Sequence, residues 1–102
     1  MISLSNNEIK IIKNILEKHI QNGKAYLFGS RARGTNKKFS DIDIAIDINR
    51  KLSLSEISRI KDDFEESDLI YITDIIDYNS ISKSFKSIID LEKVLIYEKI
   101  LY

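Results

Sequence analysis

Residues 41–48 read Asp-Ile-Asp-Ile-Ala-Ile-Asp-Ile, an alternation of period two that is typical of a β-strand buried on one face. Four isoleucines share one face of this strand, and three aspartates and Ala45 share the other. Because residues two apart on a strand project to the same side, we expect Asp41 and Asp43 to direct their carboxylates into one volume, about 6.6 Å apart along the strand. The alternative is that the aspartates form an ordinary solvated strand face.

Regular elements are predicted on both sides of this strand. Ser5 and Glu8 have the spacing of a capping box, and the apolar residues that follow recur at helical spacing. The predicted elements are a helix over 6–21, a strand over 24–28, the strand over 41–48, a helix from Ser53 or Ser55 to about Glu66, a strand over 69–77 and a helix over 79–91. Residues 94–97 fit either a last short strand or a continuation of that helix. The pattern predicts an α/β (α+β) fold, a small mixed sheet with helices packed on one face.

Composition narrows the classes of protein that are possible. The chain has 102 residues, the size of one domain spanning 1–102, with 16 Lys+Arg against 16 Asp+Glu. Zero net charge argues against a protein that holds nucleic acid mainly by neutralising phosphates. The absence of cysteine excludes a disulfide scaffold, a thiolate zinc site and a cysteine nucleophile. No apolar run is long enough to span a membrane, so we expect a soluble cytoplasmic protein.

A glycine turn precedes the aspartate strand. Residues 29–34 read Gly-Ser-Arg-Ala-Arg-Gly and follow the predicted strand over 24–28. Glycine lets the backbone approach a polyphosphate closely, and exposed N–H groups and the Ser30 hydroxyl can donate to its oxygens. Arg31 or Arg33 would add positive charge there. The two glycines have the spacing of a Walker A loop, but that motif is excluded because Thr-Asn follows them where Lys-Ser/Thr is required.

A third carboxylate is expected near the aspartate pair. Mg²⁺ prefers carboxylate oxygens, keeps several waters and is commonly completed by substrate phosphates. A third acidic residue on a neighbouring strand would allow two ions to be held, as in displacements at phosphorus. Asp74 in the predicted strand over 69–77 is the first candidate, and Asp77 is the second.

The segment Gly29–Asp47, GSRARGTNKKFSDIDIAID, resembles the signature of the DNA polymerase beta superfamily of nucleotidyltransferases. It resembles more narrowly the minimal nucleotidyltransferases, or MNT-domain proteins, which are antitoxins found beside HEPN-domain toxins. Residues 71–77 resemble the later strand of that family, in which the first aspartate is the third metal ligand. This resemblance implies a nucleotidyltransferase-like fold and a single minimal nucleotidyltransferase domain.

The resemblance also implies the site and the reaction. The implied catalytic and metal-binding residues are Asp41, Asp43 and Asp74, and the implied nucleotide-binding residues are Gly29, Ser30, Arg31 and Arg33. Two Mg²⁺ ions and ATP would be used, and the nucleotide would pass as AMP to a hydroxyl, usually a tyrosine, of the partner HEPN toxin. One of the two arginines would face the triphosphate and the other a partner.

Two other functions remain open at this stage. One is a non-catalytic antitoxin that blocks a HEPN ribonuclease by binding, and the other is a nucleotidyltransferase acting on a small-molecule hydroxyl. Since a chain of this length has no room for a second domain that presents an acceptor, we expect a protein partner to supply it. Its docking surface is expected among Tyr78, Tyr97, Leu101 and Tyr102, for which core or rim packing is the alternative. His19 is interpreted as a surface or interface residue.

Overall fold

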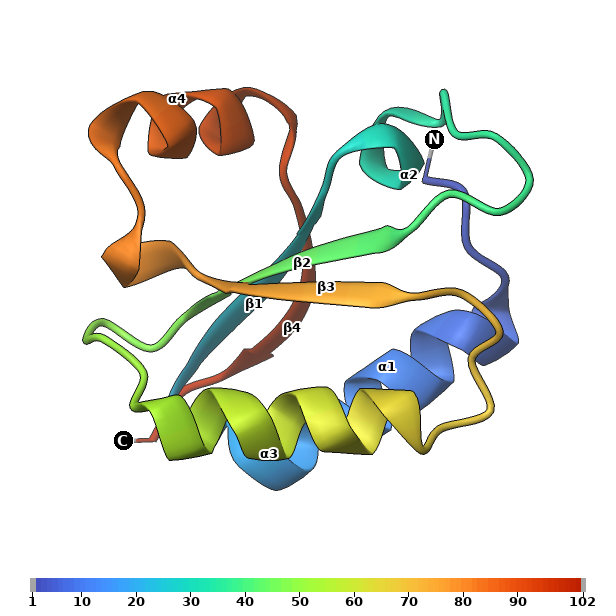
Figure 1. Cartoon of the computed structure of the whole chain (residues 1–102). Coiled ribbons are helices and arrows are strands. Elements are labelled where there is room, and N and C mark those ends of the chain that lie inside the picture. The colour runs from blue at the N-terminus through green and yellow to red at the C-terminus, as the bar shows by residue number, and fades with distance from the viewer. Residues whose placement is uncertain (1, 102) are drawn as a thin grey trace.

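A four-stranded mixed sheet forms the centre of the structure, a computed structural model that describes residues 2–101 (Figure 1). The strands are β1 (Gly23–Phe28), β2 (Ile42–Asp47), β3 (Thr73–Asp77) and β4 (Val94–Lys99). They lie in the order β3-β2-β1-β4. Strand β1 runs antiparallel to β2 and β4, whereas β2 and β3 run parallel. The predicted fold class, a mixed sheet with helices, is confirmed.

Within residues 2–101, five helical segments precede or connect the strands. They are α1 (Asn6–His19), α2 (Ser30–Arg33), α3 (Leu54–Glu65), the 3₁₀ turn η1 (Tyr78–Ser80) and α4 (Lys83–Glu92). The predicted capping box of Ser5 and Glu8 is present at α1. A second capping box begins α3, where Ser53, rather than Ser55, accepts from the backbone N–H of Glu56. Both long helices that cover the sheet therefore begin at signals written locally in the sequence.

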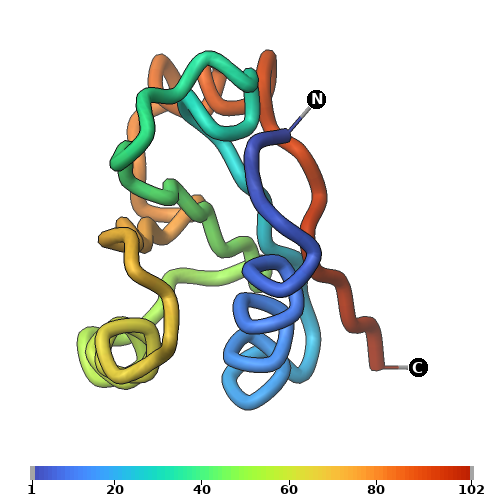
Figure 2. The backbone as a smooth tube through the Cα atoms, turned by 90° about the vertical axis from the view of Figure 1, so that its right-hand side faces the viewer, coloured from blue at the N-terminus to red at the C-terminus, as the bar shows by residue number. Residues whose placement is uncertain are grey.

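The isoleucine face of β2 forms the main core. Ile42, Ile44 and Ile46 are fully buried and pack with residues of α1 and α3, among them Leu16 and Phe64. Figure 2 shows α1 and α3 side by side on one side of the sheet. This arrangement confirms the prediction that helices cover the isoleucine face.

A second, smaller core lies on the opposite face of the sheet, so the helices cover both faces and not one face as predicted. Helix α4 buries Ile89 against Phe28 and Ala45, and Ala45 is the one residue of that face of β2 that is not an aspartate. The middle of the aspartate face, at Ala45, is therefore covered by α4. The end of β2 that carries Asp43 lies beyond this cover and stays only half-buried.

Several predicted boundaries are wrong. Residues 69–72 were expected in a strand, but β3 begins at Thr73. Residues 79–82 were expected in a helix, but they form η1 and the N-cap Ser82 of α4. Residues 94–99 form β4, which decides between the strand and the helix left open above. Within residues 2–101, no helix combines the length and the apolar character needed to cross a membrane.

Candidate active site

The three aspartates predicted to be catalytic lie at one end of the parallel pair β2–β3. Asp43 and Asp74 are register partners across this pair, and the side chains of register partners project to the same face of a sheet. Asp41 lies directly before β2, and it lines the same pocket as Asp74. The structure thus brings together carboxylates that are separated by about thirty residues in sequence.

Asp43 has the strongest electrostatic signal of the three. Its pKa is raised from 3.8 to about 6, first by burial and then by the negative charges of Asp74, Asp41 and Glu92, while Arg33 opposes the shift. Burial and the neighbouring negative charges both disfavour the ionised form of Asp43, and Arg33 does not offset them. Such an uncompensated cluster of titratable groups is typical of a functional site.

The glycine turn packs directly against Asp43. Gly29 has φ of 76°, in the left-handed region that favours glycine, and a Cβ there would collide with Oδ2 of Asp43. The register between β1 and β2, which pairs Phe28 with Asp43, brings the turn to this position. The phosphate-binding candidates Gly29 and Ser30 are therefore next to the carboxylate cluster, as the sequence analysis expected.

Glu92 joins this site although no sequence pattern indicated it. The N–H of Gly29 donates to Oε1 of Glu92 at 2.9 Å, and Arg33 pairs with Oε2 of the same carboxylate. The Glu92 side chain is 15% exposed and is the last residue of α4, 63 positions from Gly29. Only the packing of α4 over β1 and β2 brings it here, so periodicity and spacing could not reveal it.

The two arginines of the turn have different surroundings. Arg31 is buried, its Nε donates to the Ser40 carbonyl and its Nη1 donates to the Ser3 carbonyl, each at 2.9 Å. Its guanidinium also lies 3.9 Å from the centre of the Tyr71 ring. Arg31 therefore ties the N-terminal segment and the loop before β2 together. Arg33 is half-exposed beside the cluster, which makes it the arginine of this turn that fits a nucleotide ligand.

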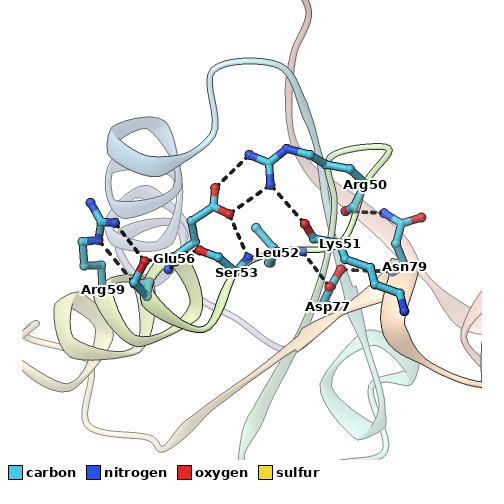
Figure 3. A network of polar contacts seen from close by, with 9 residues as sticks. Arg50, Lys51, Leu52, Ser53, Glu56, Arg59, Asp77 and Asn79 are labelled. Atoms are coloured by element: carbon cyan, nitrogen blue, oxygen red, sulfur yellow. Dashed lines mark hydrogen bonds and ion pairs between the residues drawn. The ribbon is translucent and has the colours of Figure 1, made fainter.

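Asp77, the second candidate for the third carboxylate of the cluster, has a structural role. It is buried at the far end of β3 from Asp74, and it accepts hydrogen bonds from Leu52 N at 2.8 Å, Asn79 N at 3.1 Å and Ser80 Oγ at 2.6 Å. Figure 3 shows this carboxylate between the loop that leads into α3 and the turn after β3. These contacts anchor two loops and leave Asp74 as the third member of the cluster.

The residues expected to form a docking surface do not gather in one patch. Tyr97 is half-buried against the core, and its hydroxyl donates to a backbone carbonyl at 2.8 Å. Tyr78 is half-buried in the smaller core, its hydroxyl donates to a carboxylate, and this bond raises its pKa. Leu101 is exposed, and Tyr102 lies outside the described residues. For the two tyrosines, packing is the correct alternative.

The donor set suits a hard divalent cation. Carboxylate oxygens are the ligands that Mg²⁺ prefers, and the raised pKa of Asp43 shows negative charge that such an ion would relieve. Between residues 2 and 101, no three His, Cys, Asp or Glu side chains converge closely enough to hold one ion by themselves. Mg²⁺ commonly keeps waters and takes substrate phosphates as ligands, so one or two carboxylates for each ion fit its chemistry.

Facing aspartates on parallel strands, placed beside a glycine turn, are suited to displacement at a phosphorus atom. The fold and this site define the class of protein, a nucleotidyltransferase.

The chain belongs to the polymerase beta nucleotidyltransferase family. The model of this family, described as "Polymerase beta, Nucleotidyltransferase", matches residues 10–100. A relative in Haemophilus influenzae, named "Probable protein adenylyltransferase MntA", is 36% identical over 98 residues, which are 96% of this chain and 86% of the relative. The family resemblance noted from residues 29–47 is therefore confirmed.

Solved structures show the same fold. A chain from the crystal structure of a toxin-antitoxin with AMP-PNP has a TM-score of 0.76 and 25% identity, over 89% of this chain and 73% of that chain. A chain from the complex of a tri-AMPylated Shewanella oneidensis HEPN toxin with an MNT antitoxin has a TM-score of 0.66 and 21% identity, again over 89% and 73%. Because the second structure is only 21% identical to this chain, its similarity shows the fold alone.

Proposed function

We propose that this chain is an antitoxin that transfers AMP from ATP to a tyrosine hydroxyl of a partner HEPN-domain toxin. The observation that carries the proposal is the register pairing of Asp43 with Asp74 beside the Gly29 turn. The relative named as a protein adenylyltransferase and the toxin-antitoxin structures of the same fold support the acceptor class and the partner. Because the proposed substrate is ATP, we expect the protein to act in the cytoplasm.

In this proposal, the glycine turn binds the triphosphate. Gly29 and Ser30 donate to the β- and γ-phosphates, and Arg33 contributes positive charge beside them. The Gly29 N–H and Arg33 are both engaged by Glu92 in the structure, so Glu92 must release them when phosphate oxygens take its place. Arg31 stabilises the glycine turn through its buried hydrogen bonds and does not touch the nucleotide.

The carboxylates Asp41, Asp43 and Asp74 would hold two Mg²⁺ ions. When bound, the ions neutralise phosphate charge and make the acceptor hydroxyl more acidic. Asp43 lies between the glycine turn and β3, and its carboxylate must be ionised to bind a metal ion. Asp74, which is exposed, is placed to take the proton of the acceptor hydroxyl.

The reaction exchanges one phosphorus–oxygen bond for another. The acceptor oxygen forms a bond to the α-phosphorus of ATP, and the bond from that phosphorus to the β-phosphate oxygen breaks. Pyrophosphate leaves, and the hydroxyl proton passes to a carboxylate. The products are an AMPylated partner and pyrophosphate.

Incubation with Mg²⁺, isotope-labelled ATP and the HEPN-domain protein encoded beside this chain tests the proposal. Mass spectrometry of both proteins should find AMP on a tyrosine of the partner. The Asp41→Asn/Asp43→Asn variant should lose this transfer, whereas Asp62→Asn, a change at an exposed position of α3, should keep it. Full protection of cells by the double variant would mean instead that the chain neutralises the toxin by binding alone.

A further inference from the structure

A pocket of about 590 Å³ opens beside the carboxylate cluster, at β3. It lies between the end of α3 and the segment 69–72 that leads into β3. We call it the β3 groove, and the lining residues used below are Asp41, Phe64, Ile70, Ile72, Thr73 and Asp74. β3 is an edge strand of the sheet, so the groove is bordered by a strand that pairs on one side only (Figure 1).

The groove combines exposed apolar side chains with an unused polar atom. Ile70 is 76% exposed and Ile72 is 72% exposed, whereas ten other isoleucines of this chain are buried in the core. Oγ1 of Thr73 is buried and has no hydrogen-bond partner within the described part of the chain. The Thr73 hydroxyl is enclosed, so the surface signal comes from the two exposed isoleucines, and such apolar side chains beside a pocket are typical of a surface that another molecule covers.

The order of the strands determines what can reach this groove. β1 and its glycine turn lie on one side of β2, and β3 lies on the other side. In a displacement at phosphorus, the attacking and leaving oxygens lie roughly in line on opposite sides of the phosphorus. If pyrophosphate leaves toward Gly29 and Ser30, as the proposed function requires, then the attacking hydroxyl arrives from the side of β3.

The charge of the groove indicates the chemistry of its occupant. Asp41, Asp74 and Glu65 line it, against the single basic side chain of Lys61. Before divalent ions bind, this excess of acidic groups would attract a segment that carries Lys or Arg.

We infer that the β3 groove seats the polypeptide segment of the partner that carries the acceptor hydroxyl. This inference rests on the proposed function. Apolar side chains of the segment pack on Ile70 and Ile72, a basic side chain lies near the acidic wall, and the acceptor hydroxyl reaches Asp74. Ile70 and Ile72 are therefore docking residues that select the acceptor protein and do not take part in the chemical step.

The test compares two double variants of the full chain. Ile70→Ser/Ile72→Ser removes the apolar wall of the groove, and both side chains are exposed enough for the change to leave the fold intact. The matched control is Leu54→Ser/Ile88→Ser, which removes two exposed apolar side chains (85% and 57% exposed) that do not line the groove. Circular dichroism checks that both variants are folded.

Two affinities are measured for each variant by calorimetry. One is for a non-hydrolysable ATP analogue with Mg²⁺, and the other is for the HEPN-domain protein encoded beside this chain. The groove variant should bind the partner about tenfold more weakly or worse and should bind the analogue as the wild type does. In turnover, the KM for the partner should rise while kcat is kept.

Each other outcome overturns the inference. A loss of analogue affinity would show that the groove holds the nucleotide base, and an equal loss of partner affinity in the control would place docking elsewhere. Because binding is measured without transfer, the result does not depend on whether the wild type modifies the partner. If the wild type transfers no AMP and the groove variant still binds the partner more weakly, the proposed function is rejected and the docking site is kept.

Discussion

At Asp43, a half-buried carboxylate faces Asp74 across the strand pair, and its pKa is raised to about 6. The unfolded value is 3.8, so between these values the native state binds more protons than the unfolded state. Stability without divalent ions should therefore decrease as pH rises through this window and stay reduced above it. Asp43→Asn should raise the free energy of unfolding by on the order of 1 kcal/mol at about pH 7.5, a value reduced for the partial solvent exposure of the group.

Urea denaturation in a chelator measures this effect of Asp43. Below the unfolded pKa of 3.8, the variant and the wild type should have similar stability, because both states then carry a protonated Asp43. Adding Mg²⁺ near neutral pH should stabilise the wild type more than Asp43→Asn. A variant that is less stable than the wild type near neutral pH would contradict the prediction.

The two arginines of the glycine turn should respond differently to substitution. Arg31→Met removes a buried guanidinium that two backbone carbonyls use, so it should cost about 2–4 kcal/mol of unfolding free energy. Arg33→Met, at a half-exposed position, should change stability by less than about 1 kcal/mol. Arg33→Met should instead weaken binding of an ATP analogue by about tenfold, because it removes a charge from the proposed phosphate site. Urea denaturation and calorimetry on the same samples separate the two roles, and equal stability losses would refute the distinction.

Glu92 engages the Gly29 N–H and Arg33, the two groups that are proposed to bind phosphate. Glu92→Gln keeps the size of the side chain and removes its charge, so it should tighten binding of an ATP analogue about threefold to tenfold. The matched control is Glu98→Gln on β4, where the carboxylate pairs with Lys24 on the surface. Weaker binding by Glu92→Gln would mean that Glu92 helps to hold the nucleotide.

At the scale of elements, β3 carries two aspartates with separate roles. Asp77 accepts from Leu52, Asn79 and Ser80 and so joins the loop before α3 to η1, whereas Asp74 makes no such anchor. Asp77→Ala leaves buried donors unpaired and should cost about 2–4 kcal/mol. Asp74→Ala should keep the stability of the wild type and abolish transfer of AMP. Thermal unfolding measures the stability of both variants, and the labelled-ATP assay measures their transfer of AMP. A stable, inactive Asp77→Ala variant would reverse the roles assigned to the two aspartates.

The elements that could be predicted are those with local signals. The alternation over 41–48 predicted β2, and the serine and glutamate of each capping box mark the starts of α1 and α3. The segment 69–72 is rich in β-branched and aromatic residues, yet it lies outside the sheet, because β2 offers partners only from Ile42 onward. Propensity cannot show where a neighbouring strand begins.

No local sequence pattern could predict the long-range contacts of the structure. His19 of α1 lies 2.6 Å from Asp63 of α3, so the side chain expected to be at a surface or an interface joins two helices. The aspartates of the site could be chosen because they share a strand face or a family motif. Glu92 and the burial of Arg31 depend on packing between segments that are distant in sequence, and they required the structure.

At the scale of the whole molecule, the order of strands predicts a gradient of local stability. β1 and β2 each have hydrogen-bonded neighbours on both sides, whereas β3 and β4 are edge strands. Amide hydrogens of β1 and β2 should exchange most slowly, and those of β3 should exchange faster by about tenfold or more. Hydrogen exchange with mass spectrometry measures this order, and slower exchange in β3 than in β1 would contradict it.

Two of the contacts that helix α4 makes with the rest of the molecule, those of Ile89 and Glu92, bear on how a nucleotide can enter. Ile89 holds the helix by burial against Phe28 and Ala45, one turn before Glu92 reaches the glycine turn. Moving the helix would open an apolar core, but rotating the Glu92 side chain would not. Entry of the proposed nucleotide therefore calls for a rotamer change of Glu92 rather than a movement of the helix. This small enzyme would be ready for its substrate without any slow rearrangement of its backbone.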